Sequence, residues 1–293
     1  MKKAASKPTL ALAKEVVANR RPEANKYEQP VIEVERIIAA ADGSPEARDA
    51  LIDRIKYAIE AEKTLPIHDR FYTHWYYNQI GVLYLRAGDY ESAARAFVEE
   101  FYHGRELGVR SLEMVTTSTN AAQGQVYVLR EGADPLIYLD DYLPYVNGEI
   151  GDDDLRHGFM RSIQADAALL VGDWERAYTN ASDAIELLAQ DLNHRGGWVH
   201  QARLSRLRAA LKLKRYEVAE ADMDYFQTAL STDVAGASLP CVTALGQAAM
   251  VSHAQTKAAA RMALDEALVI CSGESNRPLR APFKFHADTI GSL

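Results

Sequence analysis

Apolar residues recur at spacings of three and four over most of the chain, and short breaks rich in Gly, Pro or polar residues separate these stretches. Because a proline inside a helix removes a hydrogen bond, the proline-free stretch between Pro144 and Pro240 favours helices of about twenty residues joined by short turns. The chain contains 46 Ala in 293 residues, and Ala has the highest helix propensity. No block shows the alternation of a strand-rich region. The sequence therefore predicts an all-α fold.

The N-terminal part of the chain differs from the middle. Residues 1–28 are polar and rich in lysine, which predicts a flexible or weakly helical segment. In residues 29–65 we expect N-terminal helices that pack on the rest of the protein, near 30–42 and 45–63. Ser44 is the predicted N-cap of the second helix, because it precedes a proline that suits a first helical turn.

One segment carries a pattern of small, aromatic and turn residues that describes a helical hairpin. Gly81 would let a neighbouring helix approach closely, and Ala93 would be the small residue where the second helix crosses the first. Gly88 and Asp89 would form the turn between them. The full pattern is Asn78-x-x-Gly81-x-x-Tyr84-x-x-x-Gly88-Asp89-Tyr90-x-x-Ala93-x-x-x-Phe97. It resembles the tetratricopeptide repeat, a helical hairpin unit that stacks into arrays.

Weaker copies of this pattern follow at a period of about 41 residues, longer than the standard repeat. The turns fall at Gly132-Ala133-Asp134, Gly172-Asp173-Trp174, Lys214-Arg215-Tyr216 and His253-Ala254-Gln255, and the crossing residues are Ile137, Ala177, Ala219 and Ala258. The resemblance to a long-period tetratricopeptide-like family implies an α-α superhelix, or solenoid, of about five hairpins over residues 66–271. An alanine-rich helical bundle that matches by chance is the alternative. After it, residues 272–293 contain two prolines and no helical period, which predicts an extended or mobile tail, free or docked in its own groove.

The resemblance also implies where a partner would bind, because such arrays line their concave groove with the first helix of each hairpin. On these helices the amides, hydroxyls and charged groups would hydrogen-bond an extended peptide or a carboxylate, although any exposed helix face carries such residues. The candidate peptide-binding or partner-binding residues are Asn78, Gln79, Arg86, Gln123, Arg130, Asp166, Gln201, Ser205, Arg208, Lys212 and Gln247. Val82 stands where the family's acidic-peptide clamp has an asparagine, which argues against that clamp.

Two further segments stand out. Residues 70–77 form the densest aromatic patch, and its side chains either fill the core, which their helical spacing favours, or line a binding surface. Residues 131–154 contain eight acidic and no basic side chains, so they form either a solvated face or a surface for a basic partner. Neither segment has the ligand spacing of a calcium or zinc site, so we expect no metal and no cofactor.

Charge and composition exclude several classes of protein. The 33 Lys and Arg against 41 Asp and Glu make the net charge −8, which argues against nucleic acid as a partner. No apolar run approaches the roughly 18 residues of a membrane-spanning helix, so we expect no membrane contact. The cysteines, Cys241 and Cys271, lack the spacing of a zinc site and indicate no disulfide framework, which favours a reducing compartment. We expect a cytoplasmic location, with an organellar transit segment as the alternative because of the N-terminal lysines.

No phosphate-binding loop, nucleophile elbow or histidine pair is convincing, and a carboxylate pair of Asp166 with Glu186 is the weak exception. The sequence therefore predicts a non-catalytic protein-binding or peptide-binding scaffold or adaptor that uses the groove of the superhelix. The alternatives are a structural subunit of a larger assembly, such as a homo-oligomer, and a sensor or carrier with a pocket inside the superhelix. The resemblance implies the shape of the protein but not its function, because repeat arrays serve many functions.

Overall fold

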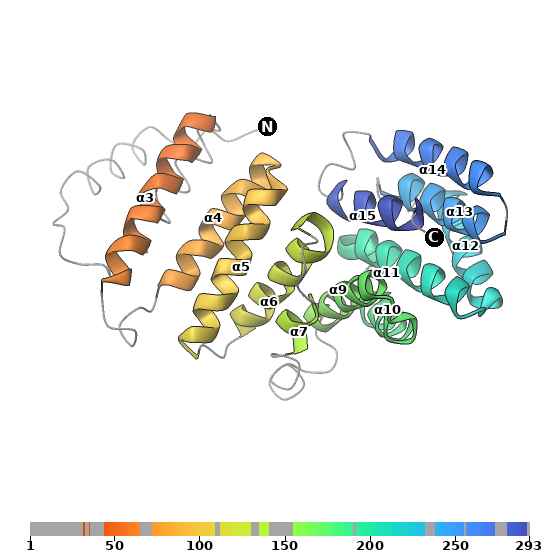
Figure 1. The fold of residues 1–293 in the computed structure, drawn as a ribbon, viewed down its shortest axis with the longest axis horizontal. Coiled ribbons are helices and arrows are strands. Elements are labelled where there is room, and N and C mark those ends of the chain that lie inside the picture. The colour runs from red at the N-terminus through yellow and green to blue at the C-terminus, as the bar shows by residue number, and fades with distance from the viewer. Residues whose placement is uncertain are drawn as a thin grey trace. The chain divides into compact units, whose positions relative to one another are not determined.

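The computed structural model describes Ile32, Glu35 and residues 44–64, 72–108, 112–129, 135–140, 155–189, 192–231, 238–254, 256–272 and 280–291. The chain divides into two compact units, residues 1–109 and 110–293. Every element in the described ranges is a helix, which confirms the prediction of an all-α protein (Figure 1). Among these helices none combines the length and the apolar content needed to cross a membrane. Residues 1–28 and most of 29–43 lie outside the described ranges.

The first unit contains three described helices, α3 (Pro45–Lys63), α4 (Thr73–Ala87) and α5 (Tyr90–Glu106). As predicted, α3 begins at Pro45 and the Ser44 hydroxyl caps it by accepting a hydrogen bond from the amide of Ala47 at 3.2 Å. The core lies between α3 and α4, where Ile55 and Tyr76 are fully buried. The rest of the aromatic patch, Tyr72, Trp75 and Tyr77, packs partly buried against this core, and Phe71 lies outside the described residues. The interpretation of the patch as core is therefore confirmed for Tyr76, and Tyr72, Trp75 and Tyr77 lie at the edge of this core.

Helices α4 and α5 form the hairpin that the clearest repeat predicts. Gly88 ends α4 in the left-handed conformation at φ 78°, and the Asp89 carboxylate accepts a hydrogen bond from the amide of Ser92 at the start of α5. Ala93 is buried between the helices. A Cβ atom at Gly81 would lie 2.5 Å from Cε1 of Phe97, so this glycine permits the close approach of α5.

We expect Gly81→Ala to lower the free energy of unfolding of the first unit by about 1–2 kcal/mol. Overpacking costs about 1–3 kcal/mol, and the better helix propensity of alanine returns up to about 1 kcal/mol. Urea unfolding followed by circular dichroism measures this loss, and the same change should cost less in a Phe97→Leu background. An equal cost in both backgrounds would contradict the proposed clash with Phe97.

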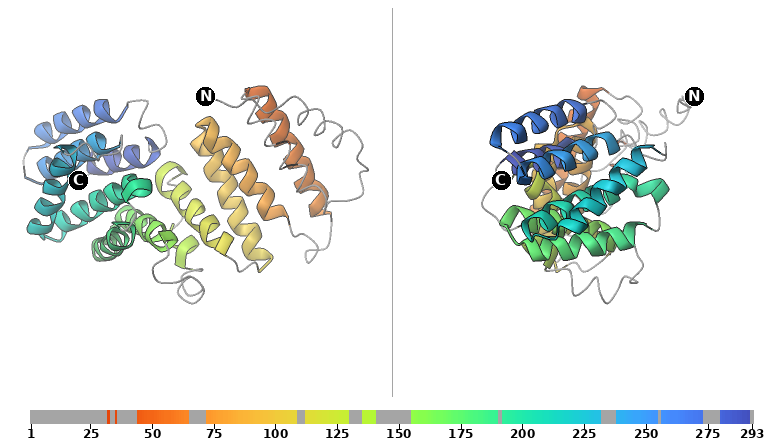
Figure 2. Two further views of the ribbon diagram at one scale, coloured as in Figure 1. Left: turned by 180° about the vertical axis from the view of Figure 1, so that it is seen from behind. Right: turned by 90° about the vertical axis from the view of Figure 1, so that its right-hand side faces the viewer.

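The second unit contains ten described elements. Their order is α6 (Leu112–Gly124), the π-helical turn η3 (Gln125–Leu129), α7 (Ile137–Asp140), α9 (Leu155–Val171), α10 (Trp174–Leu188), α11 (Leu192–Lys212), α12 (Tyr216–Ser231), α13 (Leu239–Ala254), α14 (Lys257–Cys271) and α15 (Arg280–Gly291). From α9 to α15 each helix packs on the next, and α9, α11, α13 and α15 also pack in series on one another (Figure 2). These four helices thus form a continuous series within the second unit.

Two further predicted turns are present in this unit. Gly172 at φ 78° ends α9 and the Asp173 carboxylate caps α10, while Lys214 at φ 59° lies between α11 and α12. At the third predicted turn, His253 and Ala254 instead belong to α13 and Gln255 lies outside the described residues, while Thr256 caps α14. The fourth, at residues 132–134, lies outside the described ranges.

The prediction of buried residues at the helix crossings is partly correct. Ala177 and Ala219 are fully buried, as expected of small residues at a helix crossing. Ala258 is exposed and Ile137 is 48% exposed, so the prediction is wrong at these two positions. At Ala258 the register fails because α14 begins only at Lys257, and the deeply buried alanine of that helix is Ala267.

The prediction of an extended tail is wrong for residues 280–291, which form the helix α15. Phe283, His286, Ala287 and Ile290 recur at helical spacing and are buried, so this short stretch has an apolar face that the prolines obscured. Pro282 stands in the first turn of α15, where a helix tolerates proline. The buried face packs on α13, α14 and η3.

A disulfide joins Cys241 in α13 to Cys271 in α14, with the two Cα atoms 4.7 Å apart. The prediction that the cysteines form no disulfide is therefore wrong. The reason is geometric, because the two positions lie at nearly equal distances from the turn of an antiparallel hairpin and so face each other. Disulfides persist in oxidising compartments, so the cysteines no longer support a reducing one.

Candidate functional site

Two predicted groove residues of the first unit instead join the helices of their own hairpin. The side-chain amide of Asn78 donates to both carboxylate oxygens of the buried Glu100 in α5, at 3.0 and 3.1 Å. Gln79 is buried beside it and donates to the Asn78 side-chain oxygen at 3.3 Å. The expectation that these two amides face a partner is therefore not met. Arg86 is exposed at the end of α4.

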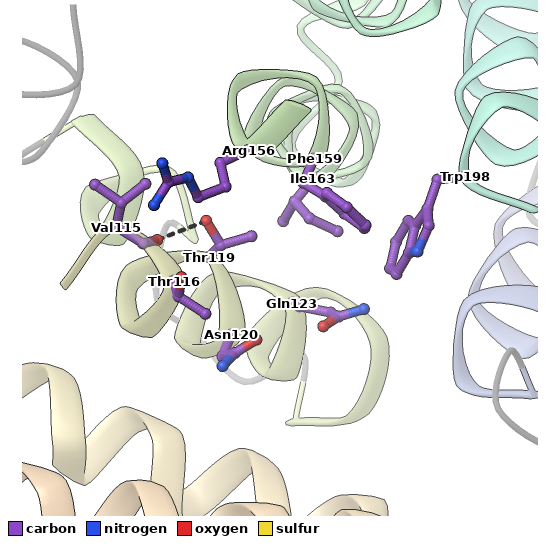
Figure 3. A pocket seen from close by; sticks show the side chains of 9 residues that line it. All are labelled: Val115, Thr116, Thr119, Asn120, Gln123, Arg156, Phe159, Ile163 and Trp198. Atoms are coloured by element: carbon purple, nitrogen blue, oxygen red, sulfur yellow. Dashed lines mark hydrogen bonds between the residues drawn. The ribbon is translucent and has the colours of Figure 1, made fainter. Parts of the chain in front are cut away.

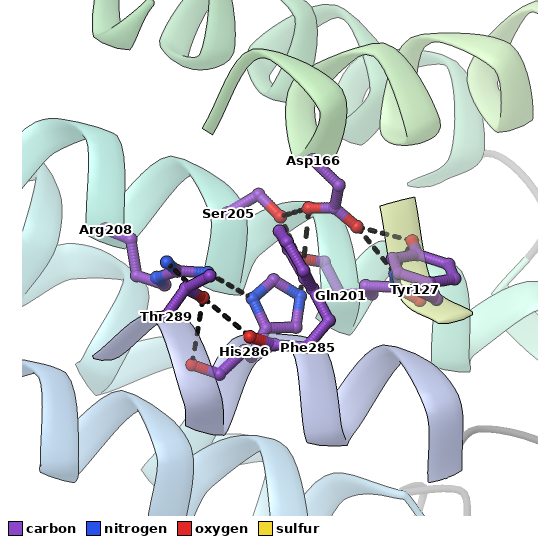
Figure 4. A network of polar contacts seen from close by, with 8 residues as sticks. All are labelled: Tyr127, Asp166, Gln201, Ser205, Arg208, Phe285, His286 and Thr289. Carbon is purple, nitrogen blue, oxygen red and sulfur yellow. Dashed lines mark hydrogen bonds and ion pairs between the residues drawn. The ribbon is translucent and has the colours of Figure 1, made fainter. Parts of the chain in front are cut away.

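Four predicted groove residues of the second unit meet in one buried polar network (Figure 4). At its centre is Asp166 in α9, whose carboxylate accepts hydrogen bonds from Ser205, Gln201 and the Tyr127 hydroxyl of η3. The Gln201 side chain donates to the Asp166 carboxylate at 2.8 Å and also contacts the Tyr127 hydroxyl. Asp166, Gln201 and Ser205 have no exposed surface, so they do not line an open groove.

The fourth of these residues, Arg208, joins the network to the C-terminal helix. Its Nη1 donates to Nδ1 of His286 at 2.6 Å, and its Nη2 donates to the Thr289 hydroxyl at 2.7 Å. Nε2 of His286 lies 3.7 Å from the Asp166 carboxylate, so the imidazole stands between the two charged groups. Phe285 packs beside Tyr127 with 5.6 Å between ring centres. Helix α15 and η3 thus cover the polar positions of α9 and α11.

Burial shifts the ionisation of these groups. It raises the pKa of the Asp166 carboxyl, while the hydrogen bonds from Ser205, Tyr127 and Gln201 act in the opposite direction. Burial and the neighbouring carboxylate raise the pKa of Tyr127 well above its usual value, so the hydroxyl remains a donor. Burial lowers the pKa of Arg208 to about 10, which leaves it a cation at neutral pH.

The network contains a serine, an aspartate and a histidine, but their order does not suit nucleophilic catalysis. In a catalytic triad the histidine stands between the other two and takes the proton of the serine. Here Asp166 stands between Ser205 and His286, and all three are fully buried. The weak candidate for a carboxylate pair is not supported, because Glu186 is exposed on α10 while Asp166 is enclosed. The arrangement joins α9, α11, η3 and α15 through buried polar contacts.

An open pocket of about 240 Å³ lies between α6, α9 and α11 (Figure 3). Its lining consists of Val115, Thr116, Thr119, Asn120, Gln123, Arg156, Phe159, Ile163 and Trp198. Phe159 and Trp198 pack edge to face with 4.7 Å between ring centres, and together with Ile163 they form an apolar wall. Asn120 and Gln123 stand one helical turn apart on α6, so the pocket combines an aromatic wall with two neighbouring amides.

The remaining predicted residues have different surroundings. Of the groove candidates, Gln123 lines the pocket just described, and Lys212 lines a second pocket together with Arg208. Gln247 is exposed on α13, and Arg130 lies outside the described residues. Phe159 and Trp198 were not predicted as site residues. Both are apolar residues on helices that carry polar and apolar side chains, and nothing else in the sequence distinguishes them.

The acidic stretch 131–154 is described only over residues 135–140. There Asp140 pairs with Arg176 of α10 at 2.6 Å, so this carboxylate already has a basic partner within the chain. Among the described residues no group of three or more His, Cys, Asp or Glu side chains is placed to hold a metal ion.

Comparisons with known proteins assign no family to the chain. No protein-family model matches it, and neither a curated protein nor a solved structure matches it.

Proposed function

We propose that the protein is a non-catalytic peptide-binding scaffold whose repeats are tetratricopeptide-like and stack as a solenoid. The turns at Gly88, Gly172 and Lys214 support the repeats, since each joins two antiparallel helices at a position that the pattern specifies. The serial packing of α9, α11 and α13 supports the stacking, because repeat arrays join the first helices of successive hairpins in this way.

The observation that carries the binding proposal is the pair of amides beside an aromatic wall in the pocket of α6, α9 and α11. Each amide offers donors and an acceptor, as the backbone of an extended peptide requires. The wall of Phe159, Ile163 and Trp198 would take one apolar side chain of that peptide and so determine specificity. The pocket volume of about 240 Å³ is below the range of about 300–1,000 Å³ that suits drug-sized ligands, which favours a single anchor residue.

A selection from random linear peptides tests this proposal directly. The Kd of a selected peptide, measured by fluorescence anisotropy, should rise about tenfold in Asn120→Ala/Gln123→Ala, because two hydrogen bonds are lost. The matched control is Gln227→Ala, which removes an exposed amide from α12 outside the pocket and should leave the Kd unchanged. Circular dichroism verifies that each variant is folded.

Other outcomes of the same experiment separate the alternatives. Peptides that bind all variants equally would overturn the assignment of the pocket. A small molecule retained through purification and seen by native mass spectrometry would favour a carrier. A structural subunit would instead use an outer surface such as α14, where Met262 and Val269 are each 73% exposed, and its assembly would persist in the pocket variant.

A further inference from the structure

A second pocket, of about 210 Å³, lies between α11 and α13, apart from the proposed peptide site. Arg208, Leu211 and Lys212 line it from α11, and Ala249, Ser252 and His253 line it from α13. Its chemistry differs from that of the first pocket. Two of the six lining residues are cations, none is acidic, and no large aromatic side chain is present.

Arg208 and Lys212 place two cations on one face of α11, and of the two only Arg208 interacts with a nearby carboxylate among the described residues, that of Asp166. Arg208 and Lys212 are four residues apart, and like charges at this spacing destabilise a helix. The other two arginines in the same part of α11 are balanced, since Arg203 and Arg206 both donate to the buried Asp222 of α12. Lys212 pairs with no carboxylate in the described part of the chain, and its ammonium lies 5.5 Å from the ring centre of Trp174.

Arg208 is fixed in place before any ligand arrives. Two of its nitrogens are held by His286 and Thr289 of α15, and only 3% of the residue is exposed. Its Nε is buried without a hydrogen-bond partner among the described residues, so one donor of a nearly enclosed cation is still unused. A charge held in a place of low dielectric acts more strongly on a nearby anion than a solvated charge does.

We propose that the pocket between α11 and α13 binds an oxyanion, the phosphate or carboxylate group of a ligand. Arg208 supplies a fixed positive charge at its floor, and Lys212 supplies a mobile ammonium at its rim. Ser252 and His253 line the opposite helix, where the Ser252 hydroxyl donates to the Ala248 carbonyl at 2.7 Å and His253 Nε2 lies 3.3 Å from the Tyr216 hydroxyl. The pocket volume suits one such group with a short attached chain. This site is independent of the peptide pocket and does not rest on its function.

Titration of the full chain with separate probes tests the site. The probes are inorganic phosphate, succinate and a neutral-capped dipeptide with a free C-terminal carboxylate, at constant ionic strength. Backbone amide NMR signals of Lys212, Ser252 and His253 should shift and saturate with at least one probe. Lys212→Gln should raise the Kd about tenfold, as loss of a charged hydrogen bond implies.

The matched control is Lys257→Gln, which removes the same charge from an exposed position of α14 and should leave the Kd unchanged. Tighter binding of phosphate would identify a phosphorylated ligand, and tighter binding of the dipeptide would identify a peptide C-terminus. Absence of a saturable shift with all three probes, or an equal effect of the two lysine variants, would overturn the proposal. Asn120→Ala/Gln123→Ala should bind the oxyanion with an unchanged Kd. Failure of the oxyanion site can therefore be distinguished from failure of the peptide site.

Discussion

Replacement of Asp166 by alanine should lower the free energy of unfolding of the second unit by about 3–5 kcal/mol. The substitution removes the shared acceptor of Tyr127, Gln201 and Ser205, each of which is buried and would lose a partner. It also removes the carboxylate that balances the enclosed charge of Arg208, and removal of one member of a buried charge pair is typically this costly. Urea unfolding measures the change through tryptophan fluorescence in a Trp75→Phe background, which leaves Trp174 and Trp198 of the second unit.

Two control experiments show whether the loss of stability is specific to the buried network. Asp224→Ala removes an exposed carboxylate from α12 and should change the same free energy by less than about 0.5 kcal/mol. If charge balance contributes, Asp166→Ala should cost less in an Arg208→Met background, with a coupling of about 1 kcal/mol or more. A loss below about 1 kcal/mol for Asp166→Ala in the otherwise native second unit would show that the network contributes little to its stability.

The hairpins could be predicted because their signals are local. A glycine with a positive φ next to an aspartate both ends one helix and caps the next, and these two functions need only adjacent residues. The same chemistry recurs at Gly172 and Asp173. Local rules therefore defined where α4 ends and α5 begins, and where α9 ends and α10 begins.

The burial of the predicted groove residues could not be derived from the same rules. Tyr127 meets Asp166 across 39 residues and Gln201 across 74, and His286 meets Arg208 across 78. The helix periodicity shows which residues share a face, but it does not show that η3 and α15 cover that face. The sequence did contain one indication of burial. Residues 162–169 of α9 include several alanines, as is typical of an enclosed helix, and in the structure all of these residues are buried.

The pockets illustrate the same limit. Gln123, Arg208 and Lys212 were candidates because they are polar residues on the first helices of hairpins, and all three line pockets. The residues that complete each pocket come from neighbouring helices, such as Trp198 of α11 beside Gln123 of α6. Their identity depends on how the helices pack, which a single sequence does not specify.

Reduction of the Cys241–Cys271 bond is the second change expected to have a large effect. The bond closes a loop of 30 residues between α13 and α14, and its loss should lower the free energy of unfolding of the second unit by about 3–4 kcal/mol. The chain-entropy argument locates the effect in the unfolded state, which becomes less restricted. Urea unfolding with and without a phosphine reductant measures it, after a cycle of unfolding that exposes the buried sulfur atoms.

The control for this experiment is the Cys241→Ala/Cys271→Ala variant, whose unfolding midpoint should not respond to the reductant. Mass spectrometry after alkylation of the untreated, unfolded protein should find neither cysteine modified. Two alkylated cysteines would contradict the disulfide and would agree with the reducing compartment that the sequence favoured. Because a cytosolic pool of thiols keeps most cysteines reduced, the same assay on protein taken directly from its native host would also test the predicted cytoplasmic location. A bonded pair there would argue against it, since the hairpin positions bring the two sulfur atoms together but only an oxidising environment keeps them joined.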